Sequence, residues 1–244
     1  MIRKYLPFLA AILSAFFVSA VCAQSVVITS KKITYRRPKP LMEHKKSFTV
    51  VRPQVRGLAP ALNKKVEAAI SYERVLKLNI REEIREIQWL YEADYEVVYN
   101  KNGILAVRLW LDGSGAYPSV FDKTVVVDLK TGARVAPGAV FTNLNALAAK
   151  IKKAQQAEIK KAREDYKKDP ENSDFDGTEY FQKADFKAAN LNEFSVGDRG
   201  VTFVYDYNFP HVVQALQPDG RFFFSWADLK PYIRRDGLFG KLAR

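Results

Sequence analysis

Apolar and polar residues alternate in several stretches of the first half of the chain, and this period of two is typical of β-strands with one buried face. The clearest stretch is residues 91–99, where tyrosines, Ala and Val share one face and three acids lie between them. An Asn-Gly turn leads into residues 104–111, so the two segments predict an antiparallel hairpin. Residues 119–129 supply the next strand of a meander. Two earlier strands are expected at residues 26–35 and 47–55.

A second period, of three to four residues, marks the helices. Residues 58–71 place their apolar side chains on one face and predict a short amphipathic helix. Residues 144–166 repeat the same pattern for about six turns and end before Pro170. Residues 227–233 predict a final short helix. The stretch 72–87 has strong helix propensity, but a direct passage into the following strand is the alternative.

Two aromatic-rich segments near the C-terminus, residues 201–209 and 221–226, predict a hairpin. The order of all these elements predicts an α+β fold, in which an antiparallel sheet (the meander plus the C-terminal hairpin) is covered by one long and two shorter helices. We expect a first half over residues 24–135, a second half over residues 136–236, and a tail over residues 237–244.

The first 23 residues have the pattern of a secretory signal peptide. Arg3 and Lys4 precede an apolar run that ends in the small-residue sequence Val21-Cys22-Ala23. We therefore expect export to the periplasm or beyond the cell. Two alternatives stay open, an uncleaved membrane anchor and a lipid on Cys22. Cys22 is the only cysteine, so the mature protein is expected to lack disulfide and thiol chemistry, and no later apolar run predicts a membrane span.

Positive charge is concentrated near the start of the mature chain. Cleavage after residue 23 lowers the formal net charge from +12 to +10, and residues 31–65 contain eleven Lys and Arg against Glu43 alone. The cations Lys31, Lys32, Arg36 and Arg37 lie on or next to the first predicted strand. This stripe favours an anionic partner such as a wall polymer, a membrane surface or an acidic protein. The alternative is an edge strand whose lysines prevent pairing with other chains.

Motifs for other chemistry are missing from the sequence. No helix-turn-helix, RNP or zinc-finger pattern accompanies the charge, which argues against nucleic acid. The two histidines lie in unrelated segments, and no HExxH, GxSxG, P-loop or dinucleotide-binding pattern occurs in context. Asn172, Asp174 and Asp176 match the first positions of a calcium loop, but Lys183 stands where a glutamate is needed. We expect no metal, no cofactor and no catalytic residue.

Three segments then identify a resemblance. Residues 115–132 (GAYPSVFDKTVVVDLKTG), 194–209 (FSVGDRGVTFVYDYNF) and 222–233 (FFFSWADLKPYI) resemble, in this order, an exported domain family of unknown function. That family occurs in the extracytoplasmic part of the lysozyme-sensing anti-sigma factor RsiV and in the N-terminal part of the peptidoglycan deacetylase PdaC. The resemblance covers residues 47–233 and implies an α+β fold with a role in protein recognition or as an accessory module of the envelope.

Two departures from the family pattern mark candidate binding residues. The family loop usually reads Gly-Ala-His, and Tyr117 replaces the histidine. A later family run, Tyr-x-Ile-Ala-Pro-Tyr, is represented by a segment that begins at Tyr207 and includes His211. Because only four residues precede the apolar run and the chain ends after the domain, we expect neither a sigma-binding segment nor a deacetylase part.

The sequence therefore predicts an exported, non-enzymatic, RsiV-like binding or accessory domain of the cell envelope, which recognises a protein or a wall polymer. A hydrolase of envelope polysaccharide that uses carboxylates near Tyr117, such as Asp112, is the alternative. A purely structural accessory with an obligate partner is the third hypothesis.

Overall fold

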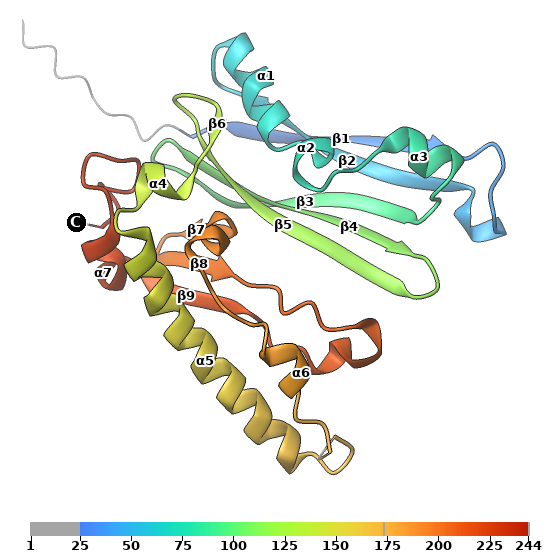
Figure 1. Cartoon of the computed structure of the whole chain (residues 1–244). Helices are drawn as coiled ribbons and strands as arrows, with labels where there is room; N and C mark the ends of the chain where they lie inside the picture. Colours follow the sequence, from blue (N-terminus) through green and yellow to red (C-terminus); the bar gives the residue numbers. More distant parts are fainter. Residues whose placement is uncertain (1–24, 173, 244) are drawn as a thin grey trace, which may run out of the picture.

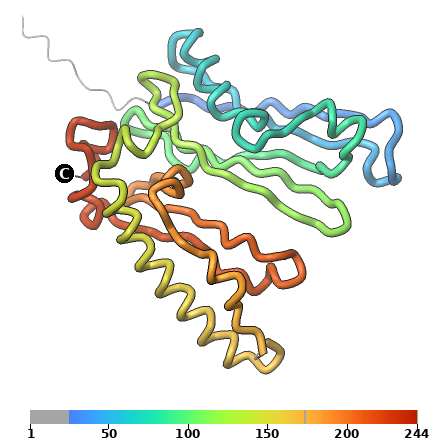
Figure 2. Tube along the Cα trace, in the orientation of Figure 1, coloured from blue at the N-terminus to red at the C-terminus, as the bar shows by residue number. Residues whose placement is uncertain are grey.

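A computed structural model of the chain describes residues 25–172 and 174–243 (Figure 1). The signal peptide, anchor and lipidation site expected within residues 1–23 lie outside the described residues. The trace shows two layers that diverge from a common end, and the long helix lies along the outside of the lower layer (Figure 2).

The first layer is a six-stranded sheet in the order β1-β2-β3-β4-β5-β6. Neighbouring strands are antiparallel except for β2 and β3, which are parallel. A turn at Asn102-Gly103, with φ of 57° and 77°, joins β3 to β4 and matches the twist of a two-residue hairpin. The strands span these residues: β1 Val27–Arg36, β2 Ser47–Arg56, β3 Leu90–Lys101, β4 Ile104–Ser114, β5 Pro118–Asp128 and β6 Ala133–Arg134.

The parallel pairing of β2 and β3 requires a crossover, and three short helices supply it: α1 (Pro60–Ala69), α2 (Tyr72–Val75) and α3 (Ile80–Arg85). They cover one face of the sheet (Figure 1). The ambiguous stretch 72–87 becomes two helices instead of one, because Lys77 between them has a φ of 59°. Asn79 starts α3, since its side chain accepts hydrogen bonds from the backbone N–H groups of Arg81 and Glu82.

The second layer is a separate three-stranded antiparallel sheet with the order β7-β8-β9. Its strands are β7 (Phe194–Gly197), β8 (Gly200–Val204) and β9 (Arg221–Ser225). The long helix α5 (Leu144–Lys168) packs beside it, as the period of its apolar residues predicts. The α+β class with one long helix and several shorter ones is therefore confirmed, with two sheets where the sequence suggested one. The remaining helices are α4 (Pro137–Val140), α6 (Thr178–Phe181) and α7 (Trp226–Leu229).

The first part of strand β4, residues 104–107, is buried on both faces, because successive side chains point to opposite sides of the sheet and both sides are covered there. Leu105, Val107 and Leu109 pack into a first core under α1–α3. Ile104 and Ala106 pack into a second core against the three-stranded sheet and α5. Strand β5 does the same with Val125 and Val127 in the first core and Val126 in the second. The central hairpin therefore joins the two layers.

The aromatic run 203–209 departs from the predicted strand. Strand β8 ends at Val204, and Asn208 takes a φ of 53°, which interrupts extended backbone. Tyr207 and Phe209 are buried in a third cluster with Tyr166 and Phe181, so their alternation reflects local packing at the far end of α5.

Residues 237–243, expected as a tail, return to the core. The side chain of Phe239 is fully buried and contacts the rings of Phe141, Phe194 and Trp226. The final predicted helix is shorter than residues 227–233. Helix α7 ends at Leu229, and the 3₁₀ turn η4 (Lys230–Tyr232) follows it.

Candidate functional site

The glycine-rich loop between β4 and β5 is held against Trp89. A Cβ atom at Gly113 would lie 2.4 Å from the Trp89 carbonyl oxygen, so only glycine allows this approach. The N–H of Ser114 donates to the same carbonyl at 3.0 Å. The indole N–H of Trp89 donates to the Ser119 hydroxyl at 3.2 Å, on the other side of the loop. The loop therefore projects from a fixed base.

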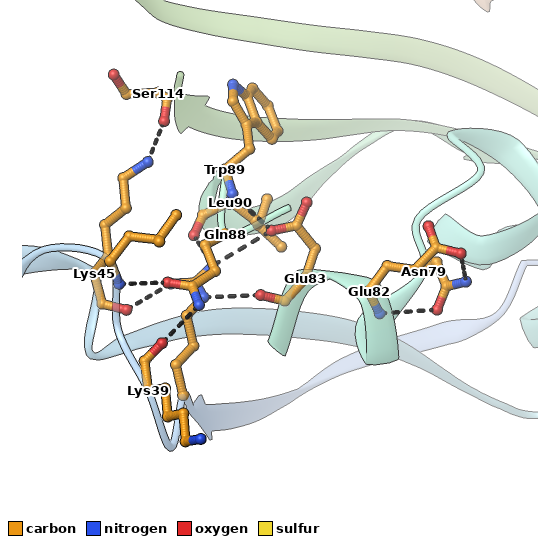
Figure 3. Close-up of polar contacts among 11 residues, drawn as sticks. Lys39, Lys45, Asn79, Glu82, Glu83, Gln88, Trp89, Leu90 and Ser114 are labelled. Carbon is orange, nitrogen blue, oxygen red and sulfur yellow. Dashed lines mark hydrogen bonds and ion pairs between the residues drawn. The ribbon is translucent and has the colours of Figure 1, made fainter. Parts of the chain in front are cut away.

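A buried arginine, Arg37, stabilises the backbone next to Trp89. Arg37 donates to the backbone carbonyls of Glu83, Lys45 and Leu90 at 2.8–2.9 Å, and to the Glu83 carboxylate at 3.4 Å. The same carboxylate accepts the N–H groups of Trp89 and Leu90 (Figure 3). Burial lowers the pKa of the Arg37 guanidinium, and the charge of Glu83 opposes this shift. Arg37, grouped with the binding cations by sequence, thus has its donors used inside the fold.

The segment between β1 and β2 is tied to the same place. The ammonium group of Lys45 donates to the Ser114 carbonyl (Figure 3). The Gln88 side chain is buried, accepts the N–H of Leu41 at 2.8 Å and donates to the Lys39 carbonyl at 2.8 Å. These bonds connect the ends of three strands and fix the orientation of the loop that carries Tyr117.

Tyr117 and His211, predicted separately from the sequence, meet in space. Their rings stack with centroids 4.4 Å apart and an interplanar angle of 21°. Tyr117 lies at the tip of the β4–β5 hairpin and is 60% exposed, whereas His211 begins the 3₁₀ turn η3 (His211–Leu216) of the second layer. The contact therefore bridges the two layers away from their shared core.

Tyr207 does not join this pair. Its hydroxyl donates to the Glu158 carboxylate at 2.7 Å, and Glu158 also accepts the N–H of Gly220 at 3.1 Å. Burial raises the pKa of Tyr207, and its hydrogen bond to Glu158 raises it further, so the phenol stays neutral. This residue holds α5 to the loop before β9.

The basic stripe forms an exposed edge. Strand β1 is the outer strand of the large sheet, and Lys31, Lys32 and Arg36 are exposed along it. Lys31 and Lys32 are neighbours in a strand, so they flank the edge on opposite faces. Beside Lys31 lies a groove of about 380 Å³ between the sheet and α1. Arg52 and Lys64 are its other cations, and Gln54, Glu67 and Ser71 are among its polar lining residues.

Charge in this groove is only partly neutralised. Arg52 pairs with Glu73, with an N–O distance of 3.2 Å for one of the two contacts. Partial burial acts to raise the pKa of Glu73, but hydrogen bonds, led by that from Arg52, bring it below its usual range. Among the residues that the structure describes, Lys31 and Lys64 have no ion-pair partner. The sequence did not single out Arg52 and Lys64, because only the fold places them beside Lys31.

Two further predicted features are explained by local structure. Asp176 accepts the backbone N–H of Thr178 at 2.8 Å, and this bond lowers the pKa of Asp176. Asp174 is exposed on the same loop. Within residues 25–172 and 174–243, no three His, Cys, Asp or Glu side chains lie together as metal ligands. Asp112 of β4, which the hydrolase hypothesis names, is paired in register with Glu92 on the neighbouring strand β3.

The described helices include none with the length and apolar character that a membrane crossing requires.

No protein-family model and no curated protein matches the chain. Solved structures do match. A DUF3298 family member from Bacteroides fragilis is 12% identical, with a TM-score of 0.56 over 90% of this chain and 98% of that one. A DUF3298 family protein from Pseudomonas aeruginosa is 13% identical, with a TM-score of 0.55 over 87% of this chain and 96% of that one. The chain thus has the fold of solved DUF3298 proteins, in agreement with the expected domain of unknown function.

Proposed function

We propose that the chain is an exported, non-enzymatic binding domain of the cell envelope and that its ligand is an anionic polymer of the wall or membrane surface. The observation that supports this most is the exposed basic edge of β1. Lys31, Lys32 and Arg36 extend from both faces of that edge, and Lys31 continues into the groove with Arg52 and Lys64. A long anionic chain can contact such an edge at several points at once, which suits an electrostatic partner.

The position of the edge supports an intermolecular role. Strand β1 pairs with β2 along its whole length on one side, and no described strand pairs with its other side. Lysines on an edge also prevent strand pairing, so a binding role must show itself as affinity for a polyanion. Recognition of a protein in the RsiV-like manner implied by the sequence is the competing outcome of the test.

The test is retention of the purified protein on isolated cell walls and on anionic membranes at low and moderate salt. The variant Lys31→Gln, Lys32→Gln, Arg36→Gln should lose retention by on the order of a hundredfold, since each cation near an anionic surface contributes about 1 kcal/mol. The matched control, Lys153→Gln, Lys160→Gln, Lys161→Gln, removes three exposed lysines of α5 and should bind normally. Equal losses in both variants, or retention of a protein partner independent of the edge, would overturn the proposal.

A second candidate function rests on the pair Glu92 and Asp112. Carboxylates on directly opposed residues of neighbouring strands can act as a general acid and a nucleophile or base. Turnover of peptidoglycan fragments by the purified protein, lost in Asp112→Asn but kept in Asp94→Asn, would favour the hydrolase. No turnover in the unmodified protein would remove it.

A further inference from the structure

A second cationic site lies outside the basic edge, where α1, α2 and the β5–β6 turn meet. A hollow of about 380 Å³ is lined by six residues, three of which are cations: Lys65, Ala69, Arg74, Gly132, Ala133 and Arg134. No acid is among them. The sequence did not reveal the site, because Arg74 and Arg134 fall in a region whose formal charges cancel.

The three cations also lack ion-pair partners in the part of the chain that the structure describes. Acids on the adjoining segments are used elsewhere. Glu67 accepts the N–H of Val55 at 2.8 Å, and Glu73 pairs with Arg52. Asp128 accepts the N–H of Lys130 and the hydroxyl of Thr131 within its own turn. The positive charge of the hollow is therefore uncompensated.

Arg134 is held in position without its outer donors being used. Its Nε donates to the Ala69 carbonyl at 2.8 Å at the end of α1, and its two Nη groups make no hydrogen bond to the described residues. Burial lowers the pKa of Arg134, and the positive charge of Arg74 lowers it further. Both side chains line the same hollow, so an anion bound there would offset the repulsion between their charges.

The turn that forms the hollow depends on Gly132. This residue has a φ of 67°, and a Cβ there would lie 2.9 Å from Leu62 and 3.1 Å from Lys65. Glycine therefore lets the turn lie close to α1 and brings Arg134 beside Lys65.

We propose that Lys65, Arg74 and Arg134 bind a phosphate group. Two planar guanidinium groups match the oxygens of a phosphate with paired hydrogen bonds, and a lysine adds a point charge. Three cations without an acid suit a group that carries up to two negative charges. This inference deepens the proposed function, on which it rests for the biological source of the phosphate, a wall phosphodiester or a phospholipid head group.

The first measurement is calorimetric titration of the full chain with inorganic phosphate at low ionic strength. Saturable binding is expected, and Arg74→Gln with Arg134→Gln should weaken it by on the order of a hundredfold. The control Arg81→Gln with Arg85→Gln removes two exposed arginines of α3 and should leave the affinity unchanged. Equal affinities in all three proteins would overturn the inference. If loss of the Arg134–Ala69 contact unfolds the variant, Lys65→Gln with Arg74→Gln decides, because both of these side chains are exposed and neither has an ion-pair partner among the described residues.

Competition then separates the sources. Displacement of phosphate by poly(glycerol phosphate) but not by phosphatidylglycerol vesicles indicates a wall polymer, and the reverse indicates a membrane. The variant Lys31→Gln, Lys32→Gln, Arg36→Gln should keep phosphate binding. Phosphate binding without wall or membrane retention would refute the proposed function alone, whereas edge-dependent retention without phosphate binding would refute this inference alone.

Discussion

Arg37 places a charged group in the interior, where an unpaired charge is strongly unfavourable. The structure tolerates it because three backbone carbonyls and one carboxylate surround the guanidinium. Its ring neighbour Phe48 lies beneath it, with the guanidinium carbon 4.6 Å from the centroid. The next residue, Arg36, is exposed and has no such partners among the described residues. Two adjacent arginines therefore have different roles, one in stability and one on the surface.

Substitution of these two arginines should separate the roles. Arg37→Ala is expected to lower the free energy of unfolding by about 3–5 kcal/mol, because it leaves the Glu83 carboxylate buried without its counter-ion. Arg36→Ala should change it by less than about 0.5 kcal/mol. Urea unfolding followed by circular dichroism measures both. Similar values for the two variants would contradict the structural role of Arg37.

At the scale of elements, the end of β4 is defined by a close backbone contact. Gly113 approaches Trp89 too closely for a side chain, and Trp89 also packs on Phe121 of β5 with ring centroids 5.4 Å apart. Gly115, two residues later, is different, because its nearest contact would be 3.8 Å away. Gly113 at the end of β4 therefore requires glycine, and Gly115 in the loop does not.

Alanine substitution tests this difference. Gly113→Ala should destabilise the protein by about 1–3 kcal/mol, since the new methyl group forces Trp89 or the strand to move. Gly115→Ala should be neutral or stabilising by a few tenths of a kcal/mol, because it restricts the unfolded chain. Thermal unfolding of both variants is the measurement. A loss at Gly115 as large as that at Gly113 would disprove the contact argument.

The elements that the sequence predicted correctly are those whose signal is local. The meander follows from alternation and the Asn102-Gly103 turn, and α5 follows from its repeating apolar face. The single face predicted for residues 91–99 holds only in part. A register shift between Val97 and Tyr99 leaves Val97 36% exposed and places Tyr99 in the second core, whereas Ala93 and Tyr95 pack in the first. Residues 203–209 alternate equally well, but a cluster at the end of α5 buries Tyr207 and Phe209 outside any strand. Periodicity indicates which side chains share a face, and it does not report which partner buries them.

The candidate sites likewise separate into residues with a local sequence signal and residues that only the fold brings together. Lys31, Lys32 and Arg36 were found because they are dense in the sequence, whereas Arg74 and Arg134 are 60 positions apart and balanced by acids nearby. Arg37 could not be separated from Arg36 by sequence, since its burial depends on Glu83 and Leu90. The stacking of Tyr117 on His211 likewise depends on how the two layers meet.

For the whole molecule, the two layers share the second core at one end and diverge toward the other (Figure 2). At the diverging end, the Tyr117–His211 stack is a contact between the tip of the β4–β5 hairpin and the loop after β8. A contact between exposed rings is weaker than a core, so we expect it to make only a small contribution to stability.

A double-mutant cycle should detect this second connection. Tyr117→Ala and His211→Ala are expected to show a coupling energy of about 0.5–1 kcal/mol, in the lower range for aromatic pairs because Tyr117 is largely exposed. The control cycle of Tyr117→Ala with Val212→Ala, where Val212 is 86% exposed, should show none. Urea unfolding of each variant supplies the free energies, and equal coupling in both cycles would refute the stack.

The burial of both faces at the start of β4 has a consequence for how this protein can be divided. Residues 24–135 and 136–236 look like successive modules along the chain, yet Ile104 and Ala106 of the first stretch complete the core of the second. A fragment that ends at residue 135 would expose that face to water, and a fragment that begins at residue 136 would lack its cover. A recombination event that exchanged one half for that of a relative would therefore have to change one face of β4 and keep the other. The boundary between the two cores is the sheet itself and not a linker in the chain. We therefore expect the two halves to be inherited together as one domain.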